Sequence, residues 1–206
     1  MDSNHSSHNM GLDLVRVTEA AALAAGRWIG SGNFDAAHAA ATDAMFNTLT
    51  LLQVDGIIAI GEDRLIDGAS PLCKGVAFGA GLMPFDLAVD PIDGTRLLAE
   101  GKPGAISVVA LAPRHSIRSI APAEYLDKIV VDRDAAAVLV PECLDAPAAW
   151  TLALIARAKK KAVRDLIVVV LQRTRHHDLI DEIRATGARV LLRGEGDAEA
   201  ALVAAT

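Results

Sequence analysis

The sequence has few aromatic residues and few cysteines. Aromatic side chains make up 3% of its 206 residues, whereas hydrophobic residues as a whole make up 52%. Alanine and aliphatic side chains must therefore form most of the core, as in many α/β proteins. The two cysteines, Cys73 and Cys143, are far apart and have no metal-ligand spacing. We expect two reduced thiols and no disulfide framework.

Long apolar runs and an excess of basic residues are also missing. No uninterrupted apolar stretch approaches the roughly 20 residues of a membrane span, and the polar first ten residues lack the order of a signal peptide. The formal net charge of −6 argues against a uniformly basic surface for nucleic acid or membrane. The sequence thus predicts a soluble, cytoplasmic protein without nucleic-acid or membrane partners, and a disordered lead over residues 1–10.

The order of the predicted elements indicates an α/β fold with two halves. Strand–helix–strand alternation after Pro147 predicts a parallel βαβ unit, and the change of rhythm near Asp145 separates a first half, 11–145, from a second, 146–206. The expected helices cover residues 11–28, 35–52, 148–161 and 176–185, with Asp35 as the N-cap of the second. The expected strands cover residues 56–60, 85–89, 105–111, 127–131, 135–140, 166–171 and 189–192.

The most informative stretch is Asp90-Pro91-Ile92-Asp93-Gly94-Thr95, directly after a predicted strand. The strand delivers Asp90 to its end, Pro91 is expected to stop the strand, and Gly94 lets the backbone approach a ligand closely. Two carboxylates and a backbone carbonyl are hard ligands of the kind that Mg²⁺ or Mn²⁺ prefers, and Thr95 would position or activate a water. The alternative is an Asp-Pro turn with an Asx cap.

A second acidic residue, Glu62, follows the predicted strand 56–60 as Asp90 follows strand 85–89. If these strands are neighbours, both carboxylates face one cavity. Two-metal phosphatase sites need such convergence, because ions ~3.5–4 Å apart share carboxylates. The alternative is that Gly61-Glu62-Asp63 is an ordinary surface turn.

On these residues the sequence resembles the class II (GlpX-type) fructose-1,6-bisphosphatases, within the lithium-sensitive, inositol-monophosphatase-like phosphatases. The resemblance runs in one consistent order from about Gly11 to Ala201. The acidic motif at 90–95 is specific to the superfamily, and other segments point to this family within it. These are residues 14–24, 28–30, 55–62, 86–96, 105–108, 121–122 with Tyr125, 127–128, 168–171 with 175–176, and 187–190.

The resemblance implies a layered α/β sugar-phosphatase sandwich, with a metal-binding first half and an incomplete second half that binds the sugar phosphate. It implies a hydrolase of gluconeogenesis and of carbohydrate or glycerol metabolism. Such an enzyme removes the 1-phosphate of fructose 1,6-bisphosphate, and in some relatives of sedoheptulose 1,7-bisphosphate, with Mn²⁺ or Mg²⁺. The metal would lower the pKa of the attacking water and neutralise charge on the phosphoryl group.

Carried over residue by residue, the resemblance implies that Glu62, Asp90 and Asp93 are metal ligands and that Asp90 and Thr95 are catalytic. Arg173 and Arg175 would bind the distal phosphate, which suits guanidinium forks; without the resemblance they would be a solvated strand end. The residues expected to contact substrate are Asp93, Gly94, Thr95, Tyr125, Arg173, Thr174, Arg175, Glu195, Gly196 and Asp197.

The sequence departs from the family pattern in three places. An early aspartate ligand falls at His38, which would be either a Mn²⁺ ligand or only a half-buried helix residue. Arg64 stands where the family has an acid, and its charge would oppose metal binding. The chain also stops at Thr206, before a late acidic ligand and several further elements. Because the second half would then need cover, we expect a homo-oligomer.

Three functions stay open at this point. The first is the sugar-bisphosphate phosphatase. The second, favoured by His38, Arg64 and the early stop, is a silent, truncated homologue that binds sugar phosphate or a partner subunit. The third is a phosphatase of inositol or nucleotide phosphates, which the motif at 90–95 allows but the segment around Arg173 and Arg175 disfavours.

Overall fold

The computed structural model describes residues 9–63, 70–118, 123 and 125–206. The chain divides into two compact units, Met1–Ala121 and Pro122–Thr206, each with its own hydrophobic core. This division precedes the boundary expected near Asp145, because the fully buried Ala135 belongs to the core of the second unit. The lead expected over 1–10 falls mostly on residues 1–8, which lie outside the described residues.

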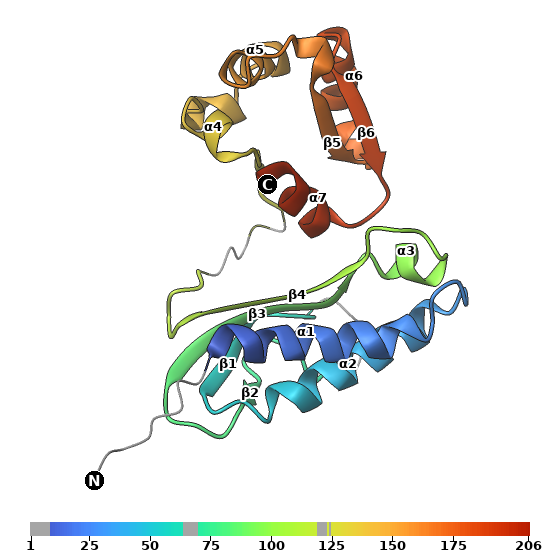
Figure 1. The fold of residues 1–206 in the computed structure, drawn as a ribbon, viewed down its shortest axis with the longest axis vertical. Helices are drawn as coiled ribbons and strands as arrows, with labels where there is room; N and C mark the ends of the chain where they lie inside the picture. Colours follow the sequence, from blue (N-terminus) through green and yellow to red (C-terminus); the bar gives the residue numbers. More distant parts are fainter. Residues whose placement is uncertain (1–8, 64–69, 119–122, 124) are drawn as a thin grey trace. The chain divides into compact units, whose positions relative to one another are not determined.

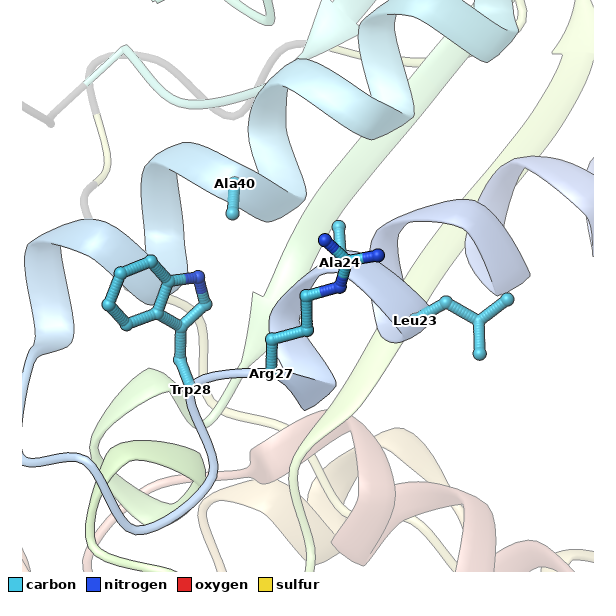
Figure 2. Close-up of a pocket in the computed structure, with 5 residues that line it drawn as sticks. All are labelled: Leu23, Ala24, Arg27, Trp28 and Ala40. Carbon is cyan, nitrogen blue, oxygen red and sulfur yellow. The ribbon is translucent and has the colours of Figure 1, made fainter.

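The first unit is a four-stranded mixed sheet with two long helices that run side by side across it (Figure 1). The strand order is β2-β1-β3-β4, with β1 and β3 parallel and the two edge strands antiparallel to their neighbours. Its elements are α1 (Met10–Gly26), α2 (Phe34–Leu49), β1 (Asp55–Ile60), β2 (Ala77–Phe78), β3 (Pro84–Asp93), α3 (Thr95–Ala99) and β4 (Ile106–Pro113). The α/β class predicted from the sequence is confirmed.

Helices α1 and α2 pack closely because their buried stripes are rich in alanine. The spacing between packed helices depends on the side chains at their contact, and Ala21, Ala25, Ala37 and Ala41 are at most 1% exposed. The predicted N-cap Asp35 is wrong. The Asn33 side chain accepts the N–H of Ala36 at 3.0 Å, since an N-cap bonds two or three residues ahead.

The sequence predicted that strand β3 stops at Pro91. The strand instead continues to Asp93 beside β4. Asp90 lies opposite Val108 and Asp93 opposite Ile106, so β3 carries one residue more than its partner in this stretch. Such a bulge accommodates a proline, which has no N–H to donate to the ladder. The aspartates therefore flank a bulge inside a strand rather than a turn after it.

The second unit contains the predicted parallel βαβ unit, because β5 and β6 pair in parallel and α6 lies between them in the chain. Its elements are α4 (Arg133–Ala136), η1 (Pro141–Leu144), α5 (Ala148–Ala158), η2 (Val163–Asp165), β5 (Ile167–Leu171), η3 (Thr174–His176), α6 (His177–Ala185), β6 (Arg189–Arg193) and α7 (Asp197–Ala205), where η marks a 3₁₀-helix. Within the ranges that the structure describes, no helix combines the length and apolar character needed to cross a membrane.

Two strands predicted in the second unit are wrong. Residues 127–131 form no helix or strand, and residues 135–140 contain the end of α4 and the turn after it. The Asp132 side chain caps α4 by accepting the N–H of Ala135 at 3.0 Å. This cap and a run of three alanines, the strongest helix formers, outweigh the β-branched residues that follow.

Candidate active site

The two acidic strand ends lie at one edge of the first sheet, as the sequence predicted. Strands β1 and β3 are parallel neighbours, and Ile60 pairs with Ala88. Glu62 and Asp90 each follow two residues after that pair. Because neighbouring parallel strands run in the same direction, both carboxylates lie beyond the same end of the β1–β3 pairing, although Asp90 still pairs with β4.

Glu62 is buried, with 6% of its surface exposed, and three side chains bind its carboxylate. The Nε2 of His38 lies 2.8 Å from Oε1, the Thr42 hydroxyl donates to Oε2 at 3.2 Å, and the Ser70 hydroxyl donates to Oε2 at 2.5 Å. His38 and Thr42 are four residues apart on α2 and so share one face of that helix. These donors compensate for the loss of water around a buried carboxylate.

The pKa values of this pair favour charge on both partners. The hydrogen bond to Glu62 raises the pKa of His38 above its usual range, against the effect of burial. Burial alone would raise the pKa of Glu62, but hydrogen bonds from His38 and Ser70 outweigh it and hold that pKa below its usual range.

The second pair of side chains at this site consists of two acidic residues, Asp90 and Asp93. Burial, and next the charge of Asp93, raise the pKa of Asp90 to about 6, although the Asp90 side chain remains accessible to solvent. Its Oδ1 accepts the N–H of Ile92 at 3.1 Å, while Asp93 is 8% exposed. Two negative charges that repel each other in this way favour a cation between or beside them.

Gly94 and Thr95 complete the motif directly after the bulge. Gly94 has φ +96°, and a Cβ there would lie 3.1 Å from Leu97 Cδ1 and 3.4 Å from Ala105 Cα, so glycine fits best. The Thr95 hydroxyl donates to the carbonyl of Ile92 at 3.1 Å. Because a carbonyl oxygen only accepts hydrogen bonds, the hydroxyl proton of Thr95 points to it. The lone pairs of the Thr95 hydroxyl oxygen can therefore accept a hydrogen bond from water.

The predicted ligand set is not gathered into one group. In the part of the chain that the structure describes, no three His, Cys, Asp or Glu side chains stand together as a metal-ligand group. The set instead consists of the pair His38–Glu62 and the pair Asp90–Asp93. Mg²⁺ is commonly held by one or two carboxylates together with waters and substrate phosphates, so the Asp90–Asp93 pair fits a hard divalent cation.

Arg64 is a position at which the sequence departs from the family pattern, and the structure describes only part of the segment around it. Asp63 is engaged, since its Oδ1 accepts the N–H of Lys74 at 2.6 Å. Arg64 itself, predicted to oppose metal binding, lies outside the described residues.

The remaining predicted substrate residues belong to the second unit. The Arg175 guanidinium stacks over the Tyr125 ring at 4.1 Å from its centroid. Arg173 Nη1 donates to the carbonyl of Gly194 at 2.6 Å, so this arginine joins the segments after β5 and β6. Thr174 begins η3. Of the two arginines, Arg175 presents its charge against an exposed aromatic ring, whereas Arg173 is tied to the backbone.

The segment 195–197 leads into helix α7. Gly196 adopts φ +85° immediately before the helix, and Asp197 Oδ2 accepts from Lys128 Nζ at 3.2 Å. Glu195 lies between β6 and α7. The structure thus gives Asp197 a partner, Lys128, that the sequence did not link to it.

Sequence reasoning missed two residues that bind Glu62. Thr42 carried a usable signal, since it follows His38 by four residues within the helix predicted over 35–52 and so shares a face with it. Ser70 carried none, because it lies between the strands predicted over 56–60 and 85–89, where the pattern predicts no further element. Both hydroxyls matter, since each occupies an oxygen of the predicted ligand.

Comparison with known proteins connects this geometry to a family. The family described as bacterial fructose-1,6-bisphosphatase, glpX-encoded, matches residues 8–206. A D-fructose 1,6-bisphosphatase class 2/sedoheptulose 1,7-bisphosphatase of Thermosynechococcus vestitus is 36% identical over 95% of this chain and 59% of its own length. The protein of the same name from Gloeobacter violaceus has the same identity and coverage.

A fructose-1,6-bisphosphatase class 2 of Haemophilus influenzae is 40% identical over 91% of this chain and 55% of its own length. The chain therefore spans less than two thirds of the length of these curated relatives. With a match over nearly its whole length, the chain belongs to the bacterial, glpX-encoded fructose-1,6-bisphosphatase family.

Proposed function

We propose that the chain is a metal-dependent phosphatase that hydrolyses the 1-phosphate of fructose 1,6-bisphosphate. The observation that carries the proposal is the Asp90–Asp93 pair, which flanks a bulge at the end of a strand whose parallel neighbour leads to Glu62. The names of the relatives support this substrate. The proposal includes sedoheptulose 1,7-bisphosphate as a second substrate, since the names of two relatives include sedoheptulose 1,7-bisphosphatase.

In this proposal Asp90 and Asp93 hold Mn²⁺ or Mg²⁺. A bound divalent cation supplies Lewis-acid chemistry, because it neutralises charge on the phosphoryl group and makes water a better nucleophile at neutral pH. Thr95 accepts a hydrogen bond from that water and orients it, since its own proton points to the carbonyl of Ile92. Gly94 leaves room for the substrate phosphate beside the backbone.

We propose that Arg175 and Tyr125 contact the phosphate that is not cleaved. The ring holds the guanidinium from one face, so its N–H groups can point outward to oxygen atoms, a geometry that suits phosphate. Arg173, Thr174, Glu195, Gly196 and Asp197 would shape this contact, with Arg173 acting through the carbonyl of Gly194 rather than by direct contact.

Arg175→Ala is expected to raise the KM for fructose 1,6-bisphosphate by about tenfold with little change in kcat, because one charge-assisted hydrogen bond is lost. Steady-state kinetics check this. The matched control is Arg184→Ala, which removes an exposed arginine paired only loosely with Asp181 at 3.7 Å. An equal KM for Arg175→Ala and Arg184→Ala would remove Arg175 from the proposed contact.

The function itself is tested by release of inorganic phosphate from fructose 1,6-bisphosphate with Mn²⁺, with Asp90→Asn as the inactive reference. Turnover that stays at the level of this variant, together with retained binding of sugar phosphate, would favour the silent homologue instead.

A further inference from the structure

Three side chains of the protein contact the carboxylate oxygens of Glu62. An ionised carboxylate has about four lone-pair sites. The Oε1 of Glu62 lies within bonding distance of His38, its Oε2 accepts from Ser70, and the one hydroxyl proton of Thr42 lies within reach of both oxygens. With 4% of this side chain exposed, almost no surface remains for a further ligand.

We propose that His38 serves as a fixed hydrogen-bond partner of Glu62, so that Glu62 is not a metal ligand and the chain holds a single divalent cation at Asp90 and Asp93. The inference rests on the proposed function for the Asp90–Asp93 pair and assigns a different role to the acidic residue beside it. His38 acts here as a positioning residue through its contact with Glu62, not as a group that touches substrate.

The contacts of Glu62 oppose metal binding by its carboxylate as it stands. A metal on Oε1 would displace the His38 nitrogen at 2.8 Å and leave a half-buried, polar ring without its partner, which is costly. No such displacement is needed at Asp90, whose one hydrogen bond within the described residues comes from the Ile92 backbone.

The test is Mn²⁺ binding by the purified full chain, measured by the electron paramagnetic resonance signal of free Mn²⁺. Wild type is expected to bind one ion per chain. Glu62→Gln is expected to keep the Mn²⁺ dissociation constant within about threefold, because glutamine can still accept from His38 and Thr42. Asp90→Asn, the matched loss of one carboxylate charge, is expected to weaken binding by at least about tenfold.

His38→Asp provides a second measurement, because it replaces the imidazole that contacts Glu62 with a carboxylate and is expected to add a second Mn²⁺ per chain. Loss of binding in Glu62→Gln as large as in Asp90→Asn, two ions per wild-type chain, or one ion in His38→Asp would each overturn the inference. Wild-type chain that binds no Mn²⁺ would overturn the proposed function as well. The wild-type stoichiometry tests the idea even if a variant fails to fold.

Discussion

Asp90→Asn is expected to lower the rate of Mn²⁺-dependent phosphate release by at least about 100-fold, the scale of losing one preorganised electrostatic contact at a reacting centre. Asparagine has nearly the same shape and keeps an oxygen for the N–H of Ile92. It removes one of the two negative charges that would hold the cation. Initial rates with fructose 1,6-bisphosphate, measured by released inorganic phosphate, give the ratio.

Two controls separate lost charge from lost structure. Asp43→Asn changes an exposed aspartate on α2 and is expected to leave the rate within about twofold. The melting temperature of metal-free Asp90→Asn should not fall, because the substitution removes the repulsion from Asp93 that raises the Asp90 pKa. A rate for Asp90→Asn equal to that of Asp43→Asn would contradict the proposed role of Asp90.

Gly61→Ala is expected to lower the free energy of unfolding by about 3 kcal/mol. A Cβ at Gly61 would lie 1.9 Å from the carbonyl oxygen of Leu72 and 2.9 Å from Ile58 Cγ2. Both obstructing residues are fully buried, and the same Leu72 carbonyl accepts the N–H of Glu62 at 3.1 Å. Relief of the clash must therefore shift the backbone that positions Glu62. Chemical denaturation measures the change.

Gly26→Ala is the matched control for that substitution. Gly26 is the last residue of α1, and no atom lies within 4 Å of a Cβ added there. Since alanine is the better helix former, this variant is expected to be as stable as wild type or slightly more so. If both alanine variants unfold at the same denaturant concentration as wild type, the packing at Gly61 is looser than the structure shows.

The sequence predicted the part of the site that depends on local pattern. Buried strand patterns at 56–60 and 85–89 located the two acidic residues, and the structure confirms that these strands are parallel neighbours. It did not predict the bulge at Pro91, because proline more often ends a strand than lies within one. The bulge depends on β4 as a partner, which no local pattern specifies.

Contacts made across the fold were harder to predict. The sequence left His38 as either a metal ligand or a half-buried helix residue. The structure gives it 21% side-chain exposure and a contact with Glu62, which is 24 positions away in the chain. Ser70 reaches the same carboxylate from a loop without periodicity. Such partners are set by packing between elements, so composition and spacing alone do not reveal them.

The same reason explains the error at 135–140. Val138 and Val140 favour a strand in isolation, but the Asp132 cap and the burial of Ala135 in the second core select a helix. The two compact units divide between Ala121 and Pro122, so residues 127–140 lie in the second unit, whereas the boundary expected near Asp145 places them in the first half.

The position of a bound Mn²⁺ ion tests the central claim most directly. An anomalous difference map from crystals grown with Mn²⁺ should show one peak in the first unit, in contact with carboxylate oxygens of Asp90 and Asp93, with Glu62 still bound to His38. A first unit without a peak at these aspartates, or with its peak elsewhere, would contradict the claim that the end of β3 holds the catalytic cation.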